Sequence, residues 1–479
     1  MGEIARLGRM LWGRQISALE LTEGYLAAAE ERKELNAYVR LTPEKALAAA
    51  RETDARLAAG EELSPLAGLP MGLKDNLSTR GVPTTCCSRM LEEYRPVYDA
   101  WVWENLHRQG AVLLGKTNMD EFAMGSSCET SCYGPTRHPF VPGMVPGGSS
   151  GGSACAVAAG LAVYALGSDT GGSVRQPAAF CGLVGLKPTY GAVSRYGLIA
   201  YASSLDQVGV LTSSVEDAAV VLDAISSRDD RDSTCTGLPG GPVAPHLSEF
   251  PRGLRLGVPR EWLEGAQPAV ARAVEQALRV WESLGAQIRL CSLPRLRQAL
   301  PVYYILACAE ASSNLGRYDG VRYGLRGEGE TFYQMACDAR SRGFGPEVRR
   351  RILLGTYVLS AGHRDACYQK AQRLRRTIAR ELEEQWRDCH ALVGPTVPTT
   401  AFPMGFAQSD PVRTYQTDLC TVPANVAGLP ALSLPCGQDE RGLPVGVQLM
   451  GPQYSEGRLL QIAYGYQQAA GRGGWTCGR

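Results

Sequence analysis

The sequence predicts a single large α/β domain, built on a mixed and mainly parallel central sheet that is covered by helices. Short apolar runs alternate with helical stretches along the chain, which is typical of strands joined by helical crossovers. No internal repeat or low-complexity tract interrupts this alternation. The stretch rich in Asp, Pro and Gly at 229–251 is followed by strands that continue the same sheet. We therefore expect residues 1–479 to form one domain.

The helices are predicted from a 3.6-residue repeat of apolar positions, and the strands from short apolar runs. The expected helices are 19–34, 43–57, 101–109, 153–159, 268–284 and 456–469. The expected strands are 68–73, 111–114, 163–166, 254–258, 287–291, 391–393 and 445–450. We divide the domain into an N-terminal helical segment of about 1–60, a catalytic core of about 61–225, and a remainder of about 250–470 that completes the sheet and carries substrate-recognition segments.

The composition excludes several classes of function. Lys and Arg number 49 against 48 Asp and Glu, so the chain lacks the basic footprint of a nucleic-acid-binding domain. The longest apolar run, 154–166, is shorter than the roughly 18 residues of a membrane span. Fifteen cysteines are scattered along the chain, without the paired spacing of a zinc site. We expect a cytoplasmic protein with reduced cysteines and with no metal or cofactor of its own.

Two glycine-flanked serine clusters carry the clearest chemical signal. They are Pro-Gly-Gly-Ser-Ser-Gly-Gly-Ser at 146–153 and Gly-Ser-Asp-Thr-Gly-Gly-Ser-Val-Arg-Gln-Pro at 167–177, with no histidine close to either. A serine hydroxyl is a poor nucleophile unless a neighbouring base takes its proton. Glycines let the backbone approach a substrate closely. The pair of clusters indicates a nucleophile, a proton relay and backbone N–H donors, served by a base other than histidine.

Lys74 is the candidate base, because it follows an apolar strand. Burial there would lower its pKa and let it act as a neutral amine. Taken alone, the simpler interpretation is a lysine at a strand end that points into water. Ser149 or Ser150 could relay a proton to it, although both could also simply line a tight turn.

Ser173 is the candidate nucleophile. The N–H groups of Thr170, Gly171 and Gly172, which precede it, could form an oxyanion site. The alternative is a glycine turn that caps a helix. A phosphate-binding loop is excluded, because no Gly-Lys-Ser/Thr ends either cluster.

Together these elements resemble the amidase signature family. The similar runs are Lys74-Asp-Asn, 147–153, 169–178 and Gly-Leu-Val-Gly-Leu-Lys-Pro-Thr at 182–189, and similarity extends over nearly the whole chain. The resemblance implies the amidase signature fold and a Ser–cis-Ser–Lys triad. In that triad Ser173 is the nucleophile, Ser149 relays the proton after a cis peptide bond from Gly148, and Lys74 is the base. The resemblance selects Ser149 over Ser150, whereas spacing alone leaves the choice open.

Within the family, the chain is similar to the glutaminase subunits of bacterial tRNA-dependent amidotransferases. The similar runs are 115–127, 190–197, 202–207, 310–315, 317–320, 350–356 and 418–425. This resemblance implies that ammonia from glutamine passes to a B subunit. That subunit would use ATP and Mg²⁺ to amidate misacylated tRNA, whether Glu-tRNA(Gln), Asp-tRNA(Asn) or both, and a small C subunit would wrap the pair. The alternatives are a stand-alone amidase acting on small or aryl amides, and an inactive scaffold subunit, which the complete triad disfavours.

Free glutamine carries a carboxylate and an ammonium beside its amide, so a site that selects it needs a fixed cation and a fixed anion. By the same resemblance, Arg351 and Asp418 occupy the positions that would supply them, with Tyr303 or Tyr304 as a neighbour. The alternatives are a solvated helix face for the arginine and an exposed helix cap for the aspartate.

Overall fold

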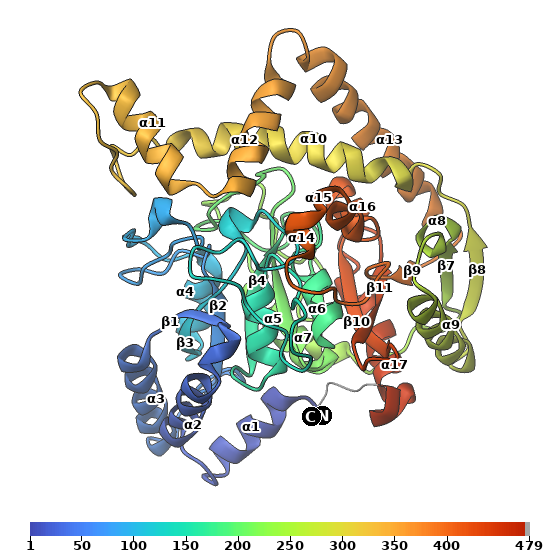
Figure 1. The fold of residues 1–479 in the computed structure, drawn as a ribbon. Coiled ribbons are helices and arrows are strands. Elements are labelled where there is room, and N and C mark those ends of the chain that lie inside the picture. The colour runs from blue at the N-terminus through green and yellow to red at the C-terminus, as the bar shows by residue number, and fades with distance from the viewer. Residues whose placement is uncertain (475–479) are drawn as a thin grey trace.

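A computed structural model describes residues 1–474, apart from the side chains of residues 408, 411 and 472–474. An 11-stranded mixed sheet runs through the molecule and is covered by helices (Figure 1). Strands on both sides of the 229–251 stretch belong to this sheet. The predicted α/β fold, a single large domain on a mixed sheet, is confirmed.

The strands follow the order β1-β3-β2-β4-β6-β5-β10-β11-β9-β7-β8 across the sheet. In chain order they are β1 (Tyr38–Leu41), β2 (Pro70–Lys74), β3 (Val112–Thr117), β4 (Tyr164–Asp169), β5 (Val184–Lys187), β6 (Gln207–Thr212), β7 (Arg255–Pro259), β8 (Gln287–Cys291), β9 (Ala391–Pro395), β10 (Ala431–Gln438) and β11 (Pro444–Met450).

The balance of strand directions differs from the prediction of a mainly parallel sheet. Parallel pairing is confined to β3–β2–β4 on one side and β9–β7–β8 on the other. The strands between them pair antiparallel, from β4 through β6, β5, β10 and β11 to β9, and β1 joins the edge antiparallel. The strands expected from the sequence omitted β5, β6 and β10, which form this antiparallel centre.

The helices lie on both faces of the sheet and above one end of it. They are α1 (Glu3–Trp12), α2 (Ala18–Glu31), α3 (Pro43–Ala58), α4 (Trp101–Arg108), α5 (Gly151–Ala158), α6 (Arg175–Cys181), α7 (Val215–Ile225), α8 (Arg260–Leu263), α9 (Pro268–Ser283), α10 (Leu296–Asn314), α11 (Phe332–Gly343), α12 (Pro346–Leu359), α13 (Lys370–Gln385), α14 (Phe406–Ser409), α15 (Pro411–Tyr415), α16 (Val422–Ala427) and α17 (Glu456–Gly474).

Two apolar layers hold the sheet between its helices. On one face α5 and α6 pack against the central strands, and their small, fully buried residues let them lie close to the sheet. On the other face α4, α7, α9 and α17 complete the largest apolar core. Beyond one end of the strands, α10, α12 and α13 form a separate layer (top of Figure 1). The two serine clusters lie at the starts of α5 and α6, between the sheet and this layer.

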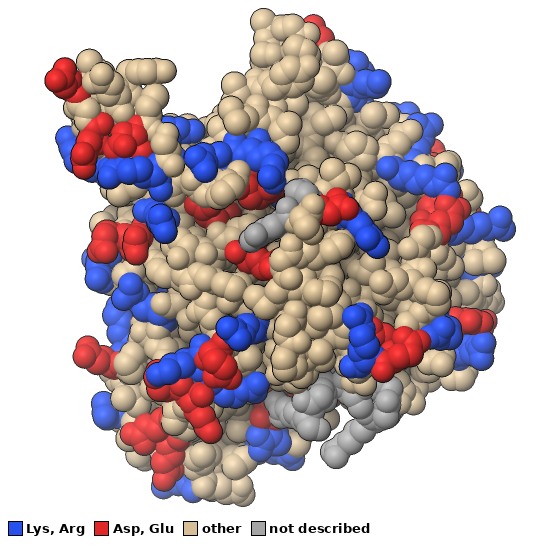
Figure 2. Space-filling model, in the orientation of Figure 1, with Lys and Arg blue, Asp and Glu red and all other residues tan. Residues whose placement is uncertain are grey.

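The surface agrees with a chain of nearly balanced charge. On the face shown in Figure 2, basic and acidic side chains are interspersed over much of the molecule. None of the helices in the described part of the chain is both long enough and apolar enough to cross a membrane.

Candidate active site

Lys74 ends strand β2 and is fully buried beside the first serine cluster. Its Nζ donates to Ser149 Oγ and to Ser150 Oγ, each at 2.8 Å, and to Ser168 Oγ at 3.0 Å. Burial lowers the pKa of Lys74 to about 8, because the charged ammonium loses its hydration, although the negative charge of Asp120 opposes the shift. A strand-end lysine pointing into water is therefore not what the structure shows.

The hydroxyl partners distinguish the two serines. Ser150 Oγ donates to the carbonyl oxygen of Ser168 at 3.2 Å, so its proton already has an acceptor. Ser149 Oγ makes its described hydrogen bond to Lys74 alone. A neutral amine has one lone pair, and among these two serines Ser149 is the one with a proton available to it. The peptide bond from Gly148 to Ser149 is cis, as the resemblance implies.

Ser173 lies in the tight turn between β4 and α6. Its side chain retains 7% exposure, whereas Ser149 and Ser150 have none. The N–H of Ser150 donates to the carbonyl oxygen of Ser173 at 3.1 Å, which joins the two clusters. Of the three serines, Ser173 is therefore the one that a substrate can reach.

A buried ion pair fixes the loop that carries Ser173. Asp169 is paired with Arg175 at 2.9 Å, and both side chains are fully buried. Burial alone would raise the pKa of Asp169, but the Arg175 charge overrides it and lowers the pKa to about 2. The ionised carboxylate accepts hydrogen bonds from the N–H groups of Gly172 and Val174. These bonds hold the glycine-rich turn in one conformation.

The predicted oxyanion donors are corrected at one position. The Gly172 N–H donates to Asp169 Oδ1 at 2.9 Å, so its single proton is not free for a substrate oxygen. Glycine is needed there for another reason, since φ is +134° and a Cβ would lie 2.3 Å from Thr421 Oγ1. The N–H groups of Thr170, Gly171 and Ser173 make no hydrogen bond to another described residue and remain candidates.

Asp418 lies in a short 3₁₀ turn, η7 (Gln416–Asp418), and is 6% exposed. Tyr304 donates its hydroxyl to Asp418 Oδ2 at 2.9 Å, and Ser126 Oγ donates to Asp418 Oδ1 at 3.1 Å. Burial raises the pKa of Asp418 to about 7, although the Tyr304 hydrogen bond opposes the shift. The structure thus holds a carboxyl that a bound cation would ionise, in place of an exposed helix cap.

Arg351, on α12, is 3% exposed and also lies against this cluster. Its Nε donates to Glu347 Oε1 at 2.8 Å and its Nη1 to the Tyr201 hydroxyl at 2.7 Å. Its Nη2 makes no hydrogen bond to the described residues. The guanidinium also lies 5.4 Å from the centre of the Tyr304 ring. A solvated helix face does not describe this arginine.

Tyr303 links this cluster to the serine turn. Its ring lies 5.0 Å from the Tyr304 ring, and a Cβ on Gly171 would lie 2.6 Å from its Cζ. Thr421 Oγ1 donates to the Gly171 carbonyl oxygen at 2.6 Å and to that of Asp418 at 3.1 Å. All the residues expected from the sequence therefore lie in one contiguous site.

Several residues of the site were not predicted. Ser168, Ser126 and Glu347 contact the predicted residues directly. Glu347 lies one helical turn before Arg351, so the i, i+4 spacing of opposite charges could have revealed it. The partners of Ser126 lie far away in sequence, and no local pattern indicates them. Among the described residues, no cluster of His, Cys, Asp and Glu is arranged to hold a metal ion.

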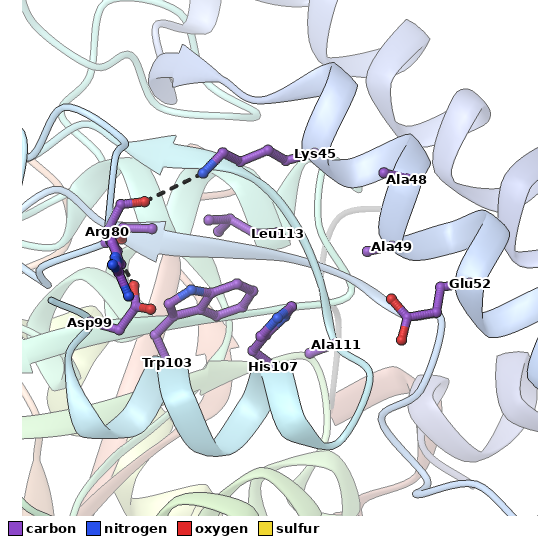
Figure 3. A pocket seen from close by; sticks show the side chains of 11 residues that line it. Lys45, Ala48, Ala49, Glu52, Arg80, Asp99, Trp103, His107, Ala111 and Leu113 are labelled. Carbon is purple, nitrogen blue, oxygen red and sulfur yellow. Dashed lines mark hydrogen bonds between the residues drawn. The ribbon is translucent and has the colours of Figure 1, made fainter. Parts of the chain in front are cut away.

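A surface hollow between α3 and α4 is separate from this site (Figure 3). Trp103 and His107 form its floor with ring centres 5.3 Å apart, and Lys45 Nζ donates to the Arg80 carbonyl oxygen at 3.3 Å. None of its lining residues belongs to the serine–lysine cluster.

The fold and the site together are those of an amide-cleaving enzyme, and the chain belongs to the amidase family, whose model matches residues 20–460. It is 53% identical over 471 residues to the A subunit of glutamyl-tRNA(Gln) amidotransferase from Prochlorococcus marinus, covering 98% of this chain and 97% of that one. Identity to the same protein of Moorella thermoacetica is 54% over 465 residues, covering 97% and 95%. The crystal structure of its Thermotoga maritima counterpart matches with a TM-score of 0.78 and 41% identity, covering 95% and 91%.

Proposed function

We propose that this chain is the glutaminase subunit of a tRNA-dependent amidotransferase. The observation that carries the proposal is the buried Lys74 amine, 2.8 Å from Ser149 Oγ, in one site with Ser173 and the Asp418–Arg351 cluster. The first group can cleave an amide, and the second can select an amino acid by its charged ends. The names of the relatives support the same function.

The reaction proceeds through an acyl-enzyme. Ser173 Oγ attacks the side-chain amide carbon of glutamine, and its proton passes through Ser149 to the neutral amine of Lys74. The N–H groups of Gly171 and Ser173, with that of Thr170, stabilise the oxyanion. The proton returns through Ser149 to the leaving nitrogen, and ammonia departs. Water then attacks the ester by the same relay, which releases glutamate and restores Ser173.

Asp418 and Arg351 select the substrate. Asp418, supported by Tyr304, binds the ammonium, and Arg351 offers its Nη2 edge to the carboxylate. Tyr303 packs between this end and the oxyanion turn. A simple amide cannot use either charge, so the cluster favours glutamine over the small and aryl amides of a stand-alone amidase.

Ammonia is consumed elsewhere in this proposal. A B subunit, with ATP and Mg²⁺, activates the misacylated tRNA, and a C subunit completes a heterotrimer. The nearly balanced charge of this chain fits an arrangement in which another chain holds most of the tRNA. The described cysteines are free thiols, which fits a cytoplasmic location. The proposed domain comprises residues 1–479 with the segments given above.

The wild-type chain, assembled with B and C subunits, is expected to form Gln-tRNA(Gln) from Glu-tRNA(Gln) with glutamine as the nitrogen donor. The measurement is ATP-dependent amidation together with glutamate release. A chain that hydrolyses simple amides but cannot support glutamine-dependent amidation in this assembly would be a stand-alone amidase. Parallel assays with Asp-tRNA(Asn) define which tRNA is served.

Replacing Asp418 by asparagine is expected to raise the KM for glutamine by roughly 10–100-fold, because a charge-assisted hydrogen bond to the ammonium is lost. In the wild type, KM should fall as pH rises through about 7, since only the ionised carboxylate attracts the ammonium. Asp418→Asn should lack that pH dependence. Steady-state kinetics across pH measure both effects.

A matched control is Asp217→Asn. Asp217 is also buried and accepts the N–H groups of Glu3 and Ile4, far from the serines in the fold. Its KM for glutamine should match that of the wild type. An unchanged KM in Asp418→Asn would exclude Asp418 from binding the amino group.

A further inference from the structure

Gln176 is fully buried on α6, one turn after Ser173. Its Oε1 accepts the N–H of Gly148 at 2.8 Å, and its Nε2 donates to the carbonyl oxygen of Ser126 at 2.8 Å. One side-chain amide therefore joins two loops. One loop leads directly into the relay Ser149, and the other carries Ser126.

The two loops serve different ends of the substrate. Ser126 Oγ donates to Asp418 Oδ1 at 3.1 Å, so its loop contacts the group proposed to bind the ammonium. Gly148 precedes Ser149, which contacts the base Lys74. A continuous path of hydrogen bonds and one peptide unit thus runs from Asp418 through Ser126, Gln176 and Gly148 to the relay serine.

We propose that Gln176 is a positioning residue that couples binding of the substrate's amino group to the placement of Ser149. The inference rests on the proposed glutaminase function. A planar amide bonded at both ends transmits a displacement of one loop to the other, and burial makes either lost bond costly. Because relay geometry controls proton transfer, glutamine would be hydrolysed faster than its fit to the pocket alone would give.

A double-mutant cycle in the assembled, full-length complex tests this coupling. Gln176→Met removes both hydrogen bonds at similar side-chain length and should lower kcat for glutamine roughly 10–100-fold, with a smaller change in KM. Asp418→Asn should lower kcat about fivefold or more in the wild-type background but less than about twofold in the Gln176→Met background. Equal kcat effects of Asp418→Asn in both backgrounds would overturn the coupling.

Gln176→Glu provides a test that does not depend on the methionine variant folding. Its carboxyl still accepts the Gly148 N–H, but it can donate to Ser126 only when protonated. Its kcat, taken relative to the wild type at the same pH, should therefore rise as pH falls. A ratio that does not change with pH would indicate a purely structural role.

The matched control is Gln207→Met. Gln207 is equally buried and also bridges two backbone groups, the N–H of Gly191 and the carbonyl oxygen of Val193. Its kcat should stay within about twofold of the wild type, and a loss equal to that of Gln176→Met would overturn the specific role. A wild-type complex without glutaminase activity would overturn the proposed function, whereas additive effects in an active complex overturn only this inference.

Discussion

Replacing Ser173 by alanine is expected to abolish glutamine-dependent amidation while leaving ammonia-dependent amidation intact. The variant has no hydroxyl to form the acyl-enzyme, and the remaining N–H donors cannot replace a nucleophile. Loss of a serine nucleophile lowers kcat by about 10⁴-fold or more in enzymes of comparable mechanism. Added ammonium salt bypasses this chain, because the partner subunit uses ammonia directly. Glutamate release and Gln-tRNA(Gln) formation with each nitrogen donor measure the two outcomes.

Ser433→Ala is the matched control for that variant. Ser433 is fully buried on β10, and its hydroxyl lies 2.8 Å from that of Thr396, so the substitution also removes a buried hydroxyl. It should retain glutaminase activity. Glutaminase activity that survives in Ser173→Ala would show that another residue is the nucleophile. Loss of the ammonia-dependent reaction would show instead that the complex itself is damaged.

The sequence predicted the outer, βαβ-like parts of the sheet better than its centre. Strands such as β8 (Gln287–Cys291) were expected with the same bounds that the structure has. The central β10 contains Pro435, where the register shifts, and a proline argues against a central strand when only the sequence is read. The direction of each pairing depends on contacts between distant segments. A sequence pattern therefore cannot show that β4 and β6 run antiparallel.

The same distinction applies to the site. Lys74 and the serines were predicted because each lies in a short, chemically unusual run. The environment of Asp418 depends on Ser126, 292 positions away, and on how α10 packs beside η7. The engagement of Gly172 by Asp169 is local, but it depends on how the turn folds, and the sequence shows only that both residues are present. Sequence thus indicated which groups react, and packing determined which of their hydrogen bonds remain free.

Replacing Lys74 by arginine is expected to lower kcat for glutamine by about 10³-fold or more, although the positive charge is kept. A guanidinium has a pKa above about 12 and cannot accept a proton at neutral pH. Lysine with a pKa of about 8 is partly neutral there and can take the proton of Ser173 through Ser149. Lys74→Met, which removes the charge as well, should be impaired at least as much.

The pH dependence of the wild type separates a base from a fixed charge. Burial lowers the Lys74 pKa, so the neutral, proton-accepting form increases as pH rises towards about 8. The rate constant kcat should therefore rise with pH and level off above that value, and Lys74→Arg should lack this inflection. Near-normal activity in Lys74→Arg would mean that the lysine acts only through its charge. Thermal unfolding of each variant checks that the buried substitution has not simply destabilised the core, since both side chains replace an amine with three hydroxyl partners. The combination of a lost inflection and an intact fold is the result that only a catalytic base predicts.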